Sequence, residues 1–293
     1  MARFKMFTAM ITPYYPNLEV NYDRAGEIAE YLVDHGSDGL VVCGTTGEAP
    51  VLHLEEKLQL FAQVQARVGS RAEVWAGTGS YDTASTVKMS QAAEKTGVDG
   101  LLVVTPYYNK PSQEGLYQHF KTIAESVSLP IMLYNIPGRT GINMLPETVA
   151  RLAAIDNIVA LKESSGIMDQ MSLLKNVLPE SMAIYSGDDS LTLPMLALGA
   201  SGVVSIASHL IGPQIKQMLE AFAAGEVQRA QEIHNQLFPM FKGLFITTNP
   251  VPVKEALNLL GQDVGGLRLP LCHAESGEIE QLIKLLRSYA LLP

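Results

Sequence analysis

The sequence has few of the residues that mark several large classes of protein. Among 293 residues there are two cysteines, Cys43 and Cys272, too few for a disulfide framework or a cysteine-based zinc site. No run of lysine or arginine occurs and the formal net charge is −9, so no nucleic-acid partner is expected. The first ten residues lack the apolar core of about 7–15 residues that a secretory signal contains. We therefore expect a soluble globular protein of the cytoplasm.

Patterns for membranes, nucleotides and metals are also missing. Residues 190–215 contain no Asp, Glu, Lys or Arg, but prolines, glycines and serines interrupt them, which favours two short buried elements over a membrane span. No Gly-x-Gly-x-x-Gly or Gly-x-x-x-x-Gly-Lys pattern indicates a nucleotide site. The six histidines show no paired spacing, and Asp188 and Asp189 lack a third ligand in their loop. We expect no metal, and a structural hydrogen-bonding role for the two aspartates.

The sequence does contain eight short apolar runs that alternate with amphipathic stretches. Runs without polar alternation are typical of strands that are buried on both faces. Eight strand–helix units predict a (β/α)8 TIM barrel, and an open doubly wound sheet is the alternative. The expected strands are residues 7–13, 39–43, 74–77, 101–105, 131–134, 158–161, 183–185 and 202–206.

Helical periodicity fills the gaps between these runs and continues after the last one. Apolar residues recur at helical spacing over 25–33 and 116–127, and Ser112 is a candidate N-cap for the second stretch. After Pro213 the sequence shows only helical stripes. We expect a barrel over residues 1–224 and a C-terminal helical extension over 225–293 that packs on it.

Polar and reactive residues follow several of the expected strands directly. Functional side chains of such barrels lie at the carboxyl ends of the strands, so these segments are expected to meet at one mouth. The segments are 44–48 (Gly-Thr-Thr-Gly-Glu), 107–111 (Tyr-Tyr-Asn-Lys-Pro), 134–140 (Tyr-Asn-Ile-Pro-Gly-Arg-Thr), 162–166 (Lys-Glu-Ser-Ser-Gly) and 186–189 (Ser-Gly-Asp-Asp).

Lys162 is the most informative of these residues. It follows four apolar residues, and burial among apolar walls favours a neutral amine that can attack a ketone to form a Schiff base. Tyr134, at the end of the preceding strand, could move protons in such chemistry. A lysine that reaches solvent, or that pairs with Glu163, is the simpler alternative.

Two further segments are candidates for binding a small carboxylate. Thr45 and Thr46 could bind one in their turn, and a plain structural turn is the alternative. Arg139 could bind one through its guanidinium group, and an ordinary surface arginine is the alternative.

Together these motifs resemble the dihydrodipicolinate synthase family of the class I pyruvate-dependent aldolases, and the resemblance covers essentially the whole chain. It implies a lyase of lysine and diaminopimelate biosynthesis whose substrates are pyruvate and L-aspartate 4-semialdehyde, with no metal or organic cofactor. It also implies a homotetramer built as a pair of tight dimers. Lys162 would form the imine with pyruvate, Tyr134 would donate and accept protons, and Thr45 would link Tyr134 to Tyr108 of an adjacent subunit.

The resemblance assigns the binding groups as well. Thr46 and the backbone at Val204 would hold the pyruvate carboxylate, Arg139 would bind the carboxylate of the semialdehyde, and Gly187 would belong to the substrate site. A sialate or 2-keto-3-deoxy sugar acid lyase is the alternative within the superfamily, which Arg139 and the paired threonines disfavour. A non-catalytic pyruvate-binding homologue is the alternative outside it.

The resemblance bears on feedback control too. Family members that L-lysine inhibits have a histidine and a glutamate in a cleft beside the active site. Motif spacing places Lys57 and Ser85 at these positions, with Tyr107 retained. We therefore expect weak inhibition by lysine or none.

Overall fold

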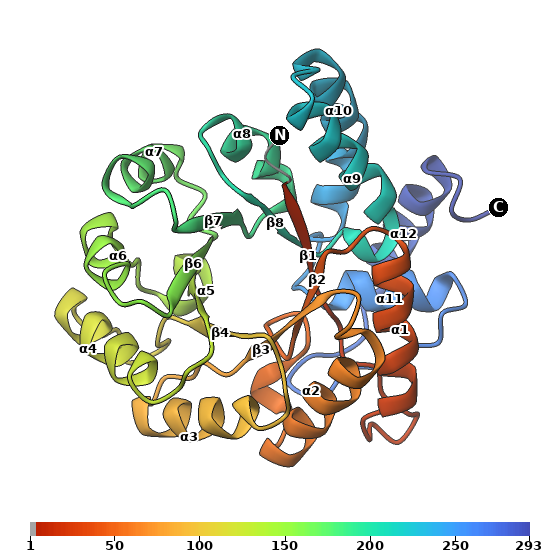
Figure 1. The fold of residues 1–293 in the computed structure, drawn as a ribbon. Coiled ribbons are helices and arrows are strands. Elements are labelled where there is room, and N and C mark those ends of the chain that lie inside the picture. Colours follow the sequence, from red (N-terminus) through yellow and green to blue (C-terminus); the bar gives the residue numbers. More distant parts are fainter. Residues whose placement is uncertain (1–3) are drawn as a thin grey trace.

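The computed structural model describes residues 4–293, which form a closed barrel of eight parallel strands in the order β1 to β8 (Figure 1). The predicted TIM barrel is thus confirmed, and the open sheet is wrong. The strands are β1 (Lys5–Ala9), β2 (Gly39–Val42), β3 (Glu73–Gly77), β4 (Gly100–Val104), β5 (Ile131–Asn135), β6 (Ile158–Glu163), β7 (Ala183–Ser186) and β8 (Gly202–Ser205).

One predicted strand boundary is wrong. The apolar run 7–13 continues to Pro13, but β1 ends at Ala9. Ile11 is 1% exposed, so it is apolar because it is buried, while its backbone N–H donates to His209 Nε2 instead of a neighbouring strand. The apolar run 7–13 therefore indicates buried residues, and these continue past the end of the strand.

Helices surround the barrel, and the apolar residues that recur at helical spacing in the sequence face the core. Buried Ala25, Ile28, Ala29 and Leu32 form the inner face of the first helix, and Ser112 caps another helix by accepting from Gly115 N at 3.1 Å. The helices are α1 (Tyr22–Asp34), α2 (Leu54–Val68), α3 (Thr83–Glu94), α4 (Gln113–Ala124), α5 (Pro137–Thr140), α6 (Pro146–Leu152), α7 (Met168–Val177), α8 (Thr192–Ala197) and α9 (Ser208–Ala223), with short 3-10 turns at Ala49–Val51 and Asp189–Leu191.

Aromatic side chains fill the barrel near the amino ends of its strands. The Phe7 ring meets Trp75 and Tyr185 edge-on, with centroids 6.2 and 5.1 Å apart. A Cβ atom at Gly39 would lie 2.4 Å from the Phe7 ring, and one at Gly100 would lie 2.7 Å from Trp75, so these two strands begin with glycine to make room. Because this end is packed, a ligand must enter from the carboxyl ends of the strands.

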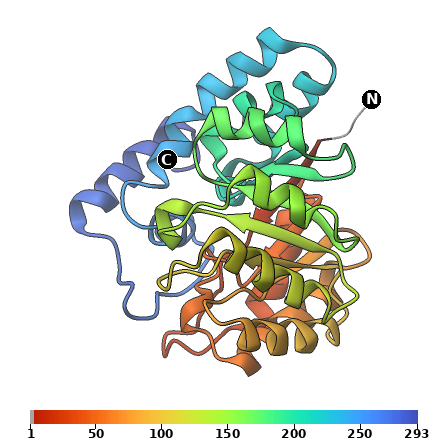
Figure 2. The ribbon, with the colours of Figure 1, turned by 90° about the vertical axis from the view of Figure 1, so that its left-hand side faces the viewer.

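Three further helices follow the barrel: α10 (Val227–Gly243), α11 (Val251–Leu259) and α12 (Ser276–Ser288). α10 packs along α9, and α11 contacts both α9 and α12, so this helical part lies along one side of the barrel (Figure 2). α9 is kinked at Ile211, and Pro213 lies at the start of its regular part, as expected for a helix N-terminus. Gly225, with φ of +80°, follows its end as predicted.

Within residues 4–293, no helix combines the length and the apolar character needed to cross a bilayer.

Candidate active site

A cavity of about 400 Å³ opens at the carboxyl ends of the strands. Thr45, Tyr134 and Arg139 line it, so three of the predicted site residues meet there. Their positions follow from the loops after β2 and β5, which the closed barrel brings to the same end. Lys162 is not among the lining residues, but its Nζ lies 4.3 Å from the ring centroid of Tyr134, which is one of them. Tyr108 does not line the cavity either.

Lys162 is almost completely buried, with 5% of its surface exposed. In the barrel it is the direct register partner of Tyr134 on β5, and its Nζ lies 4.3 Å from the centroid of the Tyr134 ring. Among the described residues no carboxylate forms an ion pair with this ammonium group. The amine therefore lies beside a phenol in a desolvated place, which is the arrangement that a Schiff-base lysine requires.

Glu163 does not pair with Lys162, so that simpler interpretation of the sequence is wrong. Successive residues of a strand point to opposite faces, and the Glu163 carboxylate lies on the other side of β6. There it accepts from Asn135 Nδ2 at 3.0 Å, Gln170 Nε2 at 3.2 Å and Ser165 N at 2.6 Å. Three neutral donors satisfy the carboxylate and leave the ammonium of Lys162 unpaired.

Gly187, at the end of β7, provides the space that the stem of Lys162 occupies. A Cβ atom at this position would lie 1.8 Å from Ser164 Oγ and 2.9 Å from Lys162 Cε. Both contacts are shorter than real Cβ atoms tolerate. The absence of a side chain at Gly187 thus sets where the lysine lies.

Thr45 and Thr46 occupy the centre of a tight turn after β2. Gly47 N donates to Gly44 O, and Glu48 N donates to Thr45 O, both at 3.1 Å. Thr46 is 2% exposed, and its Oγ1 accepts a hydrogen bond of 3.0 Å from Asn249 Nδ2. No pattern in the sequence points to Asn249, which precedes α11 and lies 203 residues along the chain from Thr46.

Arg139 lies in the short helix α5 and extends into the cavity mouth. It is exposed, and its Nη2 donates to Asn249 O at 3.3 Å. No carboxylate within residues 4–293 forms an ion pair with this guanidinium group, so it is available for a ligand carboxylate.

Val204 on β8 and Asp189 in the 3-10 turn after β7 are both buried. Val204 on β8 is 1% exposed. Asp189 accepts from Ile206 N and Ala207 N through one oxygen, each at 3.0 Å, and so fixes the chain that leaves β8. Burial raises the pKa of Asp189 above its ordinary value. Asp188 accepts from Ser190 N at 2.8 Å, so both aspartates have the structural hydrogen bonds that the sequence predicted.

Tyr107 and Tyr108 lie in the loop after β4, which ends at Val104, as their position after the expected strand predicted. Tyr107 lines the cavity and meets the Tyr81 ring edge-on at 5.5 Å, and burial raises its pKa. Tyr108 is 92% exposed and has a φ of +73°. The two neighbouring rings therefore diverge, and Tyr108 cannot complete the cavity of its own chain.

Lys57 and Ser85 line the same cavity as Tyr107, as the motif spacing predicted. Burial lowers the pKa of Lys57, although its ammonium still faces a cavity without a lining carboxylate. Across the described part of the chain, no group of three or more His, Cys, Asp or Glu side chains could hold a metal ion.

Comparisons with known proteins agree with these features. The 4-hydroxy-tetrahydrodipicolinate synthase of Desulforamulus reducens is 59% identical over 289 residues, which cover 98% of both chains. A crystal structure of DHDPS from Cyanidioschyzon merolae with lysine bound superposes with a TM-score of 0.97 at 44% identity and covers 99% of both chains. Dihydrodipicolinate synthase from Aquifex aeolicus gives a TM-score of 0.96 at 45% identity over 98% of each chain. The sequence model of the dihydrodipicolinate synthetase family matches residues 3–289. The resemblance seen in the motifs is thus confirmed, and the chain belongs to the dihydrodipicolinate synthetase family.

Proposed function

We propose that this protein is a 4-hydroxy-tetrahydrodipicolinate synthase, a lyase that condenses pyruvate with L-aspartate 4-semialdehyde in diaminopimelate and lysine biosynthesis. The relatives at 58–59% identity carry this name over nearly their whole length. The observation that carries the proposal is Lys162, which is 5% exposed and forms no ion pair within residues 4–293. Its Nζ lies 4.3 Å from the ring centroid of Tyr134, which lines the cavity.

In this proposal the Lys162 amine attacks the ketone carbon of pyruvate, and loss of water gives the imine. Loss of a methyl proton gives an enamine, whose carbon adds to the aldehyde of the second substrate. The amino group of that substrate then attacks the imine carbon, which closes the ring and releases Lys162. The lysine itself withdraws the electrons, so the reaction needs no metal and no organic cofactor.

Tyr134 is the proton donor and acceptor for these steps, since its ring centroid lies 4.3 Å from the amine and it lines the cavity. Thr45 lines the cavity with Tyr134 and would continue the proton path. The exposed Tyr108 would end that path from an adjacent subunit, because its ring points away from its own cavity. We propose a homotetramer of tight dimers in the cytoplasm, and the exposure of Tyr108 is consistent with its contact with a neighbouring chain.

The substrate carboxylates have separate partners. Thr46 accepts from Asn249, so its own O–H is available to donate to the pyruvate carboxylate together with the backbone at Val204. Arg139, held at Asn249 O, would bind the carboxylate of the semialdehyde. Gly187, which we assign to the substrate site, leaves the space that the stem of Lys162 occupies. We also propose the division into a barrel over 1–224, which carries the site, and a helical part over 225–293.

A sialate or 2-keto-3-deoxy sugar acid lyase is disfavoured by Arg139, which lies at the mouth where a long sugar chain would have to pass. Steady-state kinetics with pyruvate and aspartate semialdehyde, set against sialate and keto-deoxy sugar acids, distinguish the two. Turnover of the sugar acids in preference to the semialdehyde would refute the synthase assignment. No turnover of any substrate would favour the non-catalytic alternative.

The covalent step has its own test. Borohydride reduction in the presence of pyruvate should add one reduced pyruvyl group to the peptide that contains Lys162. Lys162→Arg should lose the label and nearly all activity, because a guanidinium group does not form the imine. A label on another lysine of the active enzyme would refute the role of Lys162.

A further inference from the structure

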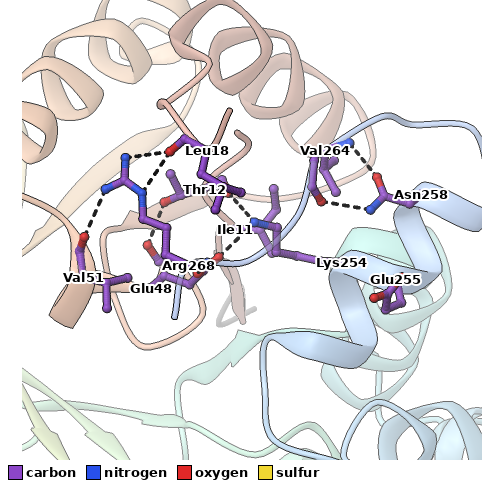
Figure 3. A network of polar contacts seen from close by, with 12 residues as sticks. Ile11, Thr12, Leu18, Glu48, Val51, Lys254, Glu255, Asn258, Val264 and Arg268 are labelled. Atoms are coloured by element: carbon purple, nitrogen blue, oxygen red, sulfur yellow. Dashed lines mark hydrogen bonds and ion pairs between the residues drawn. The ribbon is translucent and has the colours of Figure 1, made fainter. Parts of the chain in front are cut away.

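The helical part of the chain reaches the site through a buried ion pair. Lys254, on α11, is 1% exposed, and its Nζ donates to Glu48 Oε1 and to Thr12 O, both at 2.9 Å. The Glu48 side chain is completely buried, and its other oxygen accepts from Arg268 N at 3.0 Å. Figure 3 shows Lys254 and Arg268, both from the C-terminal region, beside Glu48 and Thr12 from the first part of the chain.

Glu48 is the last residue of the turn that carries Thr45 and Thr46. Its backbone has φ of +55° and ψ of 34°, a left-handed conformation that residues other than glycine rarely adopt. In this conformation its N–H closes the turn on Thr45 O at 3.1 Å. The buried carboxylate thus holds the backbone in a shape that it would not favour alone.

Lys254 also acts on the same turn indirectly, through Thr12. The Thr12 residue whose carbonyl it binds donates its own Oγ1 hydrogen to Gly47 O at 2.7 Å. One ammonium group therefore fixes the turn at Gly47 through Thr12, and at Glu48 directly. Asn249, five residues before Lys254, binds the Thr46 hydroxyl itself.

Stability alone is a weak reason for such a pair. Burial of two charges costs solvation, and well-packed apolar residues often do as well or better for stability. Burial lowers the pKa of Lys254, and the neighbouring Glu48 opposes that shift, so the ammonium depends on its partner. The Tyr14 ring adds to the enclosure, with its centroid 4.2 Å from Lys254 Nζ and 4.8 Å from the Arg268 guanidinium carbon. The Lys254–Glu48 ion pair adds directed hydrogen bonds, which an apolar pair lacks.

We propose that Lys254 and Glu48 are positioning residues, whose ion pair lets the C-terminal helices set the turn that presents Thr45 and Thr46 to pyruvate. The inference rests on the proposed function, since it assigns the turn to pyruvate. Loss of the pair moves the turn and weakens pyruvate binding. Arg139 lies on a different loop and donates to the backbone O of Asn249 rather than to the turn, so binding of the second substrate changes little.

The test measures how much pyruvate is needed for borohydride trapping at Lys162. In Lys254→Met, which keeps the length and loses the charge, the half-saturating pyruvate concentration should rise at least about tenfold. The fraction trapped at saturating pyruvate should stay near that of the wild type. Glu48→Gln, which keeps the shape and one acceptor, should show a smaller rise of about threefold or more and serves if Lys254→Met does not fold. In steady-state assays the KM for aspartate semialdehyde should change less than about twofold.

Lys216→Met is the matched control, because Lys216 also forms a largely buried ion pair, with Asp38, but at the amino ends of the strands. It should leave the half-saturating concentration unchanged. An unchanged concentration in both Lys254→Met and Glu48→Gln, or a reduced trapped fraction alone, would show that the pair only supports folding and would overturn the inference. Absence of trapping in the wild type would overturn the proposed function and this inference with it, so the two failures are distinguishable.

Discussion

Replacement of Gly187 by alanine tests the geometry around Lys162 most directly. The new Cβ atom would lie 1.8 Å from Ser164 Oγ, 2.9 Å from Lys162 Cε and 3.1 Å from Lys162 Cγ. Ser164 Oγ is buried without a hydrogen-bond partner, so it can turn away without losing one. The lysine stem must then move by several tenths of an ångström, in a core where overpacking costs roughly 1–3 kcal/mol.

A small displacement of the nucleophile has a large effect on rate. A misplacement of about 1 Å can reduce a rate by about 10²-fold, so we expect Gly187→Ala to slow borohydride trapping by roughly 10- to 100-fold. Ser164→Ala in the same chain removes the shortest contact and should recover only part of this loss, since the contacts with Lys162 remain. Thermal unfolding of both variants gives the packing cost separately.

Gly277→Ala is the control, because a Cβ atom there would meet no atom within 4 Å. It should trap pyruvate at the wild-type rate. If Gly187→Ala traps within about twofold of the wild type, the lysine does not need the space that the structure assigns to it, and the argument fails.

Three further predictions concern the assembly, regulation and pH. Tyr108→Phe keeps the ring but loses the proton path, so kcat should fall about 10- to 10⁴-fold, and mixing it with Lys162→Ala should regenerate activity in hybrid dimers. No recovery after verified subunit exchange would contradict a shared site. L-Lysine should inhibit weakly, because Lys57 repels its ammonium by up to about 4 kcal/mol before screening and Ser85 offers no carboxylate. An inhibition constant below about 0.1 mM would refute this. Burial lowers the pKa of His209 to about 4, so the folded state resists a proton that the unfolded state takes up near pH 6.5, and stability should fall as the pH drops from there toward 4. A ring that titrates above pH 5.5 in NMR spectra would contradict that assignment.

Most of the barrel could be predicted because each strand is a local pattern. Seven of the expected strands agree with the structure within about two residues, since strands buried on both faces show continuous apolar runs. The C-terminal extension was expected to be helical without bounds for its helices, and in α10 the residues Ala230, Ile233, Leu237 and Met240 face the core at helical spacing. Pro239 lies inside that helix and reads as a helix breaker, while the polar residues between the buried ones weaken the stripe.

Part of the site could likewise be predicted from short stretches of sequence, and part depends on residues that are far apart in the chain. Lys162 and Tyr134 could be paired from the sequence because each lies near the carboxyl end of its strand, and adjacent parallel strands place these ends side by side. The partners of the Thr45–Thr46 turn could not, because Asn249 and Lys254 lie 203 and 206 residues from the groups they bind. They belong to the helical part, where a lysine among Val253, Ala256 and Leu257 reads as the polar side of an amphipathic helix. Only the folded chain shows that Lys254 is buried and directed at the turn, so the C-terminal helices belong in the description of the site.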